Sequence, residues 1–390
     1  MSSTSACLAI LLLTVLLPGS LAAATVYDGQ SLTVRHRGEA RNVLAIGSTV
    51  ALGSFAREES YLLDIQRVRT DWLFTWHGVW RASVVYDHEA RAGDYLSSDE
   101  YRTFGRLAPV ELVNLDSRIT GGGEFLWRHR LYRAYAEYDS YPVRFTLGRQ
   151  QVSWGTGYFW NPTDLFNPVT FALVEPGELH GADAANLEIA LGDLSQLHAV
   201  WAQSRNSREN RGALKFNTNV ADYDFSVMAG RFFRDNVLGA DFSGQIGAAG
   251  FRGEWLHNFT DAGEDYDQLV LGVDYRLGFR LMLTGEYLYN SGALSEQELL
   301  GALDRSRAGS VLTLSSHLAG GYVDYRLHPL VHLTGYLSVD LEEGGVFAGP
   351  RLGWNVRQNL DLEFGAMLSN DRGEFKLAKN TFFATTSWYF

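Results

Sequence analysis

The sequence predicts an all-β chain that closes into one antiparallel β-barrel, and three observations carry this prediction. Apolar and polar residues alternate in stretches of about ten residues along most of the chain. Short and long connections between these stretches also alternate. The chain ends on an aromatic alternating stretch that would be an unprotected sheet edge in an open fold.

The composition excludes several classes of protein. The chain has 390 residues, with 46% hydrophobic, 13% aromatic and 20% charged, and it contains 40 Gly, 8 Pro and 1 Cys. It is too apolar to be disordered and too poor in Cys to be a disulfide scaffold. Its formal net charge of −12 argues against binding to nucleic acid, so no such partner is expected.

Residues 1–24 are predicted to be a signal peptide, which leaves residues 25–390 as a single barrel domain. Cys7 to Leu17 is an apolar run of 11 residues, too short for a membrane-spanning helix and suited to the core of an export signal. Small residues follow it, so we expect Sec-type export with cleavage near Ala24.

The alternation has one apolar and one polar face in each stretch. In 331–341, Leu333 and Leu337 alternate with Thr334 and Ser338, and 80–88, 268–276 and 280–290 behave alike. A soluble sandwich would bury the apolar face, whereas a transmembrane barrel turns it to lipid and lines a wet lumen with the polar face. The connections favour the barrel. Short turns lie near 77–78, 140–142, 192–193, 221–222, 278–279, 328–329 and 357–358, and longer loops near 92–123, 154–183, 204–210, 258–266, 291–314 and 370–379.

The last ten residues, TFFATTSWYF, resemble the C-terminal signal by which the barrel assembly machinery recognises outer-membrane proteins. Trp388 and Phe390 share one face of this stretch. With the export signal, they predict the outer membrane of a Gram-negative bacterium, where outer-membrane lipid, lipopolysaccharide and the assembly machinery would be the partners.

Counting back from Phe390 gives about 18 strands, with 16 as the alternative. Bacterial barrels have even strand numbers, so Ser31 to Arg37 is taken as the eighteenth strand and 41–60 as an extracellular loop. The alternation changes phase near Arg67 and near Gly148, where a bulge is expected. The other strands are expected near 62–76, 79–91, 125–138, 143–153, 184–191, 195–204, 211–219, 223–233, 236–243, 247–257, 267–276, 280–290, 315–326, 330–340, 345–354, 359–369 and 380–390.

The long connection 154–183 is stiff and aromatic. It is expected either to fold into the barrel and narrow it, or to cap the rim, and in the first case to present its acids to the passage. Its constriction candidates are Trp154, Tyr158, Trp160, Asn161, Asp164, Phe166, Asn167, Glu175 and Glu178.

Basic residues are mostly arginine: the 33 basic residues comprise 30 Arg and 3 Lys. Several fall in the strands nearest the long connection, where they predict a basic wall opposite an acidic loop, as in selective pores. The alternative is that they merely pair with acids across the wall. The pore-lining candidates are Arg67, Arg69, Arg81, Arg133, Arg144, Arg149, Asp274, Arg276, Glu286, Asp324, Arg326 and Asp340.

One stretch resembles a known family. Residues 147–155, LGRQQVSWG, lead into an aromatic segment with Asn161-Pro162, and the two together are similar to a strand and loop of porin-like barrels of the alginate-export and related families. The resemblance implies a passive conduit of about 18 strands and carries over no substrate.

The function predicted is therefore a porin-like channel for passive passage of small polar or anionic solutes, with no cofactor, metal or catalytic residue. The alternative is a scaffold barrel that sheathes a periplasmic or secreted partner, such as a multihaem cytochrome. A hydrolase at the rim, using His180 and Asp183, is a remote alternative, because the sequence contains none of the common hydrolase motifs.

Overall fold

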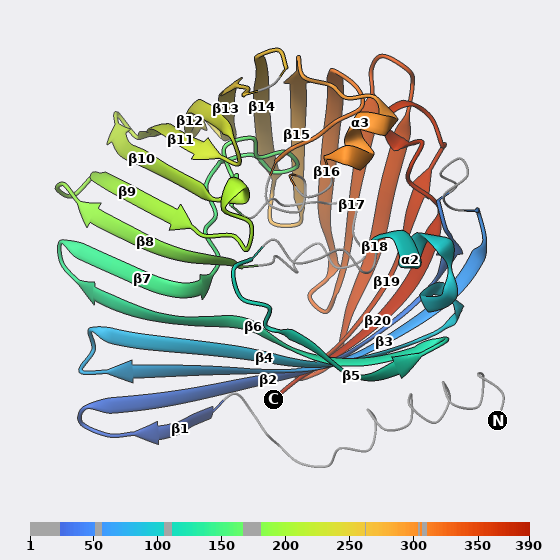
Figure 1. Cartoon of the computed structure of the whole chain (residues 1–390), viewed down its shortest axis with the longest axis horizontal. Helices are drawn as coiled ribbons and strands as arrows, with labels where there is room; N and C mark the ends of the chain where they lie inside the picture. The colour runs from blue at the N-terminus through green and yellow to red at the C-terminus, as the bar shows by residue number, and fades with distance from the viewer. Residues whose placement is uncertain are drawn as a thin grey trace.

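The structure, a computed structural model, describes residues 24–50, 57–104, 111–166, 181–261, 263–302, 305 and 310–390. Within them, 20 strands form one sheet that closes on itself through pairing of β2 with β20 (Figure 1). The strands are β1 (Ala24–Asp28), β2 (Leu32–Ser48), β3 (Ser60–Trp76), β4 (Trp80–Ala92), β5 (Asp116–Gly122), β6 (Phe125–Ser140), β7 (Val143–Gln150), β8 (Ala182–Ala190), β9 (Ser195–Ala202), β10 (Arg211–Val220), β11 (Tyr223–Phe232), β12 (Asp235–Ile246), β13 (Ala249–Phe259), β14 (Tyr266–Leu277), β15 (Leu281–Asn290), β16 (His317–His328), β17 (Val331–Asp340), β18 (Val346–Arg357), β19 (Leu360–Ser369) and β20 (Thr381–Tyr389).

Helices are short and lie in the connections. They are η1 (Asp94–Ser97), α2 (Asp99–Phe104), η2 (Ser207–Glu209), α3 (Glu296–Gly301) and η3 (Gly373–Phe375). No helix among the described residues is long and apolar enough to cross a membrane.

The barrel wall has 18 strands, because β1 and β5 are additions to it and 20 minus 2 leaves 18. β1 pairs with residues 33–36 of β2, beside the part of β2 that pairs with β20. β5 pairs with residues 125–130 of β6, beyond the part that pairs with β7. The predicted closed antiparallel barrel of 18 strands is confirmed, including the strand at 236–243.

One strand boundary was predicted wrongly. The strand expected at 31–37 continues to Ser48, so residues 41–48 of the expected loop 41–60 are strand. Residues 39–47 of β2 pair with β20, and the same stretch pairs with β3 on the other side. The extension therefore closes the wall, which the shorter strand could not have done.

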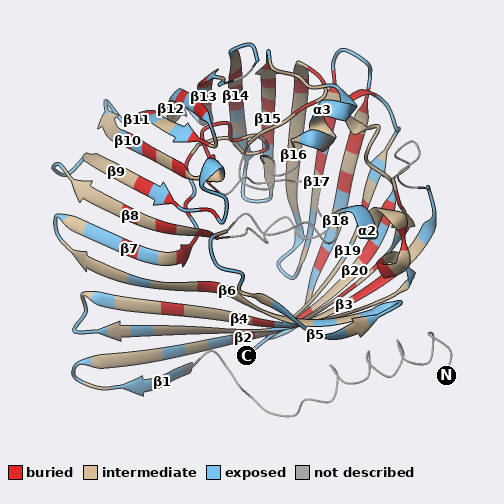
Figure 2. Cartoon of the chain, in the orientation of Figure 1, coloured by how far each residue is buried: buried red, intermediate tan, exposed pale blue. Residues whose placement is uncertain are grey.

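The two faces of the wall differ as the alternation predicts. On β14, Leu271 is 47% exposed and Val273 is 41% exposed on the outer face, whereas Val270, which precedes them on the inner face, is fully buried. Figure 2 shows the same contrast on β7–β11, where buried blocks lie away from the hairpin turns. The apolar residues of the wall are mostly outside, and the interior receives the alternating polar set.

The two ends of the barrel carry different connections. Short turns join β3 to β4, β6 to β7, β8 to β9 and the later pairs, and we call this the short-turn end. The opposite, long-loop end carries the helices and the longer connections, apart from the two-residue link between β11 and β12. The predicted signal peptide lies outside the described residues, except that Ala24 begins β1.

Candidate functional site

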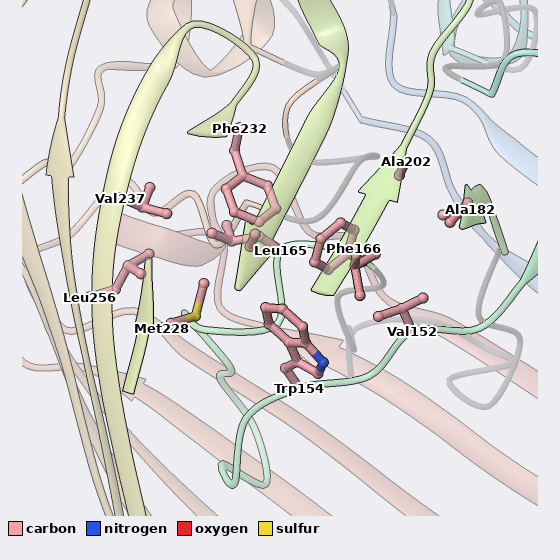
Figure 3. Packing of buried hydrophobic residues seen from close by; sticks show 13 residues of the cluster. Val152, Trp154, Leu165, Phe166, Ala182, Ala202, Met228, Phe232, Val237 and Leu256 are labelled. Atoms are coloured by element: carbon pink, nitrogen blue, oxygen red, sulfur yellow. The ribbon is translucent and has the colours of Figure 1, made fainter. Parts of the chain in front are cut away.

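Residues 151–166, which follow β7, pack against the inner face of the barrel; we call them the inner segment. Trp154 stacks edge-on against Phe166 with ring centroids 5.2 Å apart, and Phe166 contacts Phe232 of β11 at 5.1 Å. Figure 3 shows Trp154, Leu165 and Phe166 gathered with Met228 and Phe232. This buried cluster includes wall residues of β8 to β13, so the segment has an apolar core of its own.

Glu254 of β13 holds one turn of the inner segment. Its carboxylate accepts hydrogen bonds from the backbone N–H groups of Thr156, Gly157 and Thr163, the last two at 2.6 and 3.1 Å, and from the Thr163 hydroxyl at 2.8 Å. A side chain on Gly155, whose φ is +92°, would collide with this carboxylate. Glu254 can therefore approach this turn only because residue 155 is a glycine.

Glu286 of β15 holds the next turn. It accepts hydrogen bonds from the backbone N–H groups of Tyr158, Phe159 and Trp160, the last two at 2.6 and 3.4 Å. Tyr158 also lies against Tyr322 of β16, with centroids 4.8 Å apart. A carboxylate that accepts several backbone N–H groups satisfies donors that would otherwise be buried without partners.

The described constriction candidates are mostly buried in these contacts. Trp154, Asn161, Asp164 and Phe166 are each less than a tenth exposed, while Tyr158 and Trp160 are half-buried. Asp164 is 2% exposed, which corrects the expectation that it faces the passage, because the turn after Asn161 folds it inward. Asn167, Glu175 and Glu178 lie outside the described residues.

The arginines of β3, β4 and β6 form cross-strand rows on the inner face. One row runs from Arg67 to Glu89 to Arg128, and the next from Arg69 to Asp87 to Arg130. Arg69 binds Asp87 with two hydrogen bonds of 2.6 and 2.7 Å, and Arg128 reaches Glu89 at 2.7 Å. The arginines therefore gather on one wall and pair with acids there, and two of the pore-lining candidates are largely covered, since Arg67 is 3% exposed and Arg133 is 8% exposed.

Tyr132 forms the centre of this basic wall. It sits where the β4–β6 register shifts, so an extra residue turns its ring inward beside Arg133. The guanidinium carbons of Arg69, Arg133 and Arg130 lie 4.2, 4.4 and 5.3 Å from the centre of its ring. Guanidinium groups over an aromatic face are mutually compatible because each is attracted to the ring. Sequence reasoning missed Tyr132 because the bulge cannot be located from the alternation.

Arg81 and Arg144 lie near the short-turn end and are neutralised across the wall. Arg81 contacts Glu137 at 2.8 Å and Asp139 at 3.2 Å. Arg144 contacts Asp139 at 3.1 Å and Glu188 at 3.4 Å. These pairs are about two-fifths exposed on the arginine side, so they add little stability but leave both charges facing the interior.

Arg149 is on the other face of the wall, which corrects its expected inward position. The ladders through β6, β7 and β8 show no register shift, so Arg149 shares a face with the exposed Leu147. It is opposite Asp183 and binds it at 2.8 Å, and it also donates to the carbonyl of Val113 at 2.6 Å. The bulge expected near Gly148 is absent, because both ladders run through this residue without a shift although its φ is +125°.

Of the remaining candidates, Asp274, Arg276, Asp324 and Arg326 share the inner face of β14 and β16, and Asp274 pairs with Arg252. Two others are corrected. Glu286 holds the inner segment, and Asp340 is 1% exposed because it accepts hydrogen bonds from Ser315 and from backbone groups of the long loops. Arg252 and Glu254 were missed, although they lie on the polar face of a predicted strand.

The described residues offer no metal site, since no group of three or more His, Asp or Glu side chains could hold an ion. Of the proposed rim hydrolase pair, His180 is outside the described residues and Asp183 is bound by Arg149.

At the C-terminus, Phe390 exchanges two backbone hydrogen bonds with Gly38, at 2.6 and 2.9 Å. The rings of Trp388 and Phe390 lie close together, with their centroids 5.1 Å apart.

No protein-family model matches the chain, and no curated protein matches it. Solved structures do match over nearly the whole chain. OccK8 (OprE) of Pseudomonas aeruginosa has a TM-score of 0.55 at 10% identity, covering 92% of this chain and 98% of that one. The outer membrane protein OpdK of P. aeruginosa has a TM-score of 0.55 at 8% identity, covering 94% and 100%.

A third match comes from another organism: OccAB4 of Acinetobacter baumannii has a TM-score of 0.54 at 8% identity and covers 91% of this chain and 98% of that one. Together these matches place the fold among porin-like outer-membrane barrels. At such low identity they establish the fold alone.

Proposed function

We propose that the chain is an outer-membrane channel through which small polar and anionic solutes pass without energy input. The observation that carries this proposal is the closed wall of 18 strands whose outer face is apolar and whose inner face carries charged rows. A barrel of this strand number leaves an interior wide enough for water unless something fills it. Its location would be the bacterial outer membrane, after export and signal-peptide cleavage.

The preference for anions would come from one wall. The basic residues of this wall outnumber the acids among them: the arginines are Arg41, Arg67, Arg69, Arg91, Arg128, Arg130 and Arg133, and the acids are Glu39, Asp87, Glu89 and Asp116. In a narrow passage with apolar surroundings, an excess of one charge attracts counter-ions and repels ions of its own sign. We propose that the inner segment narrows the barrel opposite this wall, so that solutes pass close to the guanidinium groups.

Single-channel recording in planar bilayers tests the proposal. We expect a steady open current with anion preference, and we expect Arg133→Ala to lower the ratio of anion to cation permeability several-fold at low salt, where charge effects are least screened. Arg357→Ala is the matched control, because this exposed arginine ends β18 at the short-turn end, away from the basic wall. It should leave the ratio unchanged.

Two results would contradict the channel. A purified, folded barrel that passes no current would favour the scaffold alternative, particularly if a periplasmic or secreted partner copurified with it. An equal loss of anion preference in Arg133→Ala and Arg357→Ala would remove the basic wall as its cause.

Two finer points remain proposals. The GRQ and WG motifs support a relationship to alginate-export-type barrels, and the pairing of Phe390 with Gly38 fits a role for the C-terminal stretch in barrel assembly.

A further inference from the structure

We propose that the outer face of β8–β11 binds one lipopolysaccharide molecule, with an acyl chain in a surface groove and a lipid phosphate at Arg231. The inference rests on the proposed outer-membrane location, but it does not depend on whether the barrel conducts.

The groove arises from small residues placed between large ones. In one cross-strand row, Ala185, Trp201 and Gly212 are neighbours, and in the next row Ala199 lies between Leu187 and Leu214. Ala185, Ala199 and Ala229 form the floor, Leu187 and Leu214 flank it, and the ring of Trp201 leans over Gly212, where an added Cβ would collide with it. The resulting groove has a volume of about 480 Å³ and is apolar in its lining.

The groove is on the outside of the barrel. Trp201 is 53% exposed and Leu214 is 57% exposed, while their neighbours Val200 and Ala213 are buried in the interior cluster. An apolar groove on the lipid-facing side of a transmembrane barrel would contact hydrocarbon. A flexible acyl chain can follow the narrow floor between Trp201 and Leu214.

Charge is concentrated at one end of this groove. Arg231 is the direct cross-strand partner of Gly212, so it continues the row that holds Trp201. Arg205 and Arg208 lie in the connection between β9 and β10, immediately beyond the same row. All three are exposed, and none makes an ion pair in the part of the chain that the structure describes.

The position of these arginines favours a lipid of the outer leaflet. They lie at the long-loop end, opposite the end of β20 that leads to Phe390. In transmembrane barrels the short turns are periplasmic and the longer loops extracellular, so the long-loop end would face the cell exterior. Arginine recognises phosphate through several parallel N–H donors, and basic groups beside a membrane attract anionic headgroups. Among lipids with both phosphates and acyl chains, lipopolysaccharide is the one that belongs to the outer leaflet, so it fits the groove, the arginines and their position together.

Native mass spectrometry of the purified full-length barrel, with lipopolysaccharide added in detergent, tests the proposal. We expect one retained molecule per barrel, and about fivefold weaker retention for Arg231→Ala, the effect of one basic group near an anionic lipid. Ala199→Trp should fill the groove and weaken retention without removing any charge. The same lipid with its phosphates removed should be retained less well than the intact form.

Matched variants separate the site from general effects. Arg357→Ala removes an exposed arginine elsewhere, and Ala319→Trp adds the same bulk beside Tyr287 on another outward-facing row. Both should retain lipopolysaccharide as the native protein does. The β-sheet circular dichroism of each variant establishes that it is folded.

Three results would overturn the proposal. The first is equal retention by Arg231→Ala, Ala199→Trp and the native protein. The second is equal retention of intact and dephosphorylated lipid. The third is a change from oligomer to monomer in Ala199→Trp with lipid retention intact, which would make the groove an interface between copies of the chain. Open-channel current is measured separately, so failure of the lipid site and failure of the channel can be distinguished.

Discussion

Glu254 and Glu286 are single side chains that each position several residues of the inner segment. Their carboxylates project inward from β13 and β15 and accept the N–H groups of Thr156, Gly157 and Thr163, or of Tyr158 to Trp160. Without them, the segment would have buried backbone donors and no partner on the wall. The placement of the inner segment thus depends on acids about 90 to 130 residues later in the chain.

The first prediction concerns Glu254→Gln. The amide keeps the shape but replaces one accepting oxygen by a donor, which then faces N–H groups. Because hydrogen bonds to a charged group contribute about 1.5–3 kcal/mol, we expect a loss of stability of this order in urea unfolding. We also expect a noisier or larger single-channel current as the inner segment loosens.

Glu363→Gln is the control for this change, because Glu363 of β19 pairs with Arg351 of β18 and is about one-third exposed. A current and a stability unchanged by Glu254→Gln would show that the carboxylate does not hold the segment.

The second prediction concerns Glu374, which lies in η3 at the long-loop end. The pKa of Glu374 is raised to about 7, mainly by burial and also by the nearby charge of Asp340, although the backbone donors of Leu314 and Ser315 oppose the shift. An acid whose pKa is raised by folding prefers to be protonated in the folded state. The stability of this loop cluster should therefore fall as the pH rises from about 4.5 towards 7, and level off above it.

Hydrogen exchange of the loops around Ser315 and Glu374, compared at the same intrinsic exchange rate from pH 5 to pH 8, measures this effect. Glu374→Gln should flatten the pH dependence, because the amide cannot ionise. A dependence that persists in Glu374→Gln would assign it to another group, of which Asp340 and Lys376 are the charged neighbours.

At the scale of the element, β7 shows how a strand can contain an unusual residue and keep its register. Gly148 has a φ of +125°, and a side chain there would collide with the carbonyl of Ala134 and the Cα of Tyr135. The neighbouring ladders nevertheless run through without a shift. The glycine allows close approach of β6 to β7, which is a different use from the bulge that the sequence suggested.

The third prediction follows from that contact. Gly148→Ala should destabilise the barrel by about 1–3 kcal/mol, because it adds a backbone collision to an unfavourable φ. Urea unfolding measures the change. Gly192→Ala is a close control, since Gly192 has a φ of +134° but open space around it. If the two variants lost equal stability, the loss would come from the backbone conformation alone and not from the collision at Gly148.

Alternation predicted most strands because each wall strand has one apolar and one polar face for its whole length. The prediction failed where the two faces of a strand differ less in polarity. On β2, polar Arg41 and Asn42 interrupt the apolar pattern, so the end of the strand was placed too early. On β6, the extra residue at Tyr132 leaves no mark in composition, and only cross-strand pairing reveals it.

At the scale of the whole molecule, closure depends on the pairing of the first and last wall strands. Residues 39–47 of β2 meet β20, and Phe390 continues this pairing to Gly38. A side chain on Gly38 would collide with the ring of Phe390. The small residue and the terminal aromatic residue are therefore matched across the seam.

The fourth prediction is that Gly38→Val lowers the yield of folded barrel, because it displaces Phe390 from the seam. Heat-modifiable migration on gels, which separates folded from unfolded barrels, measures the yield. Gly335→Val is the matched control, as Gly335 lies within a strand where an added side chain meets only ordinary contacts. Similar yields for the two variants would count against a special role of the seam.

The sequence predicted the closed wall, the strand number and the charged inner face because these depend on periodicity that repeats along the chain. It did not predict which acids hold the inner segment or which arginines surround Tyr132. Those depend on which residues of distant strands become neighbours, and therefore on the tilt and register of the closed sheet. The expectation for Arg149 failed for the same reason, since one residue of phase exchanges the two faces.

The anchoring of the inner segment has a consequence for the order of events during folding. Residues 156–163 emerge before β13 and β15, yet the N–H groups of residues 156–160 and of Thr163 donate to Glu254 and Glu286 of these later strands. Contacts between such distant positions form late, because a long loop must first be closed. The inner segment should thus dock after most of the wall has been inserted, so that the passage is wide while the barrel is assembled and narrows only as folding ends.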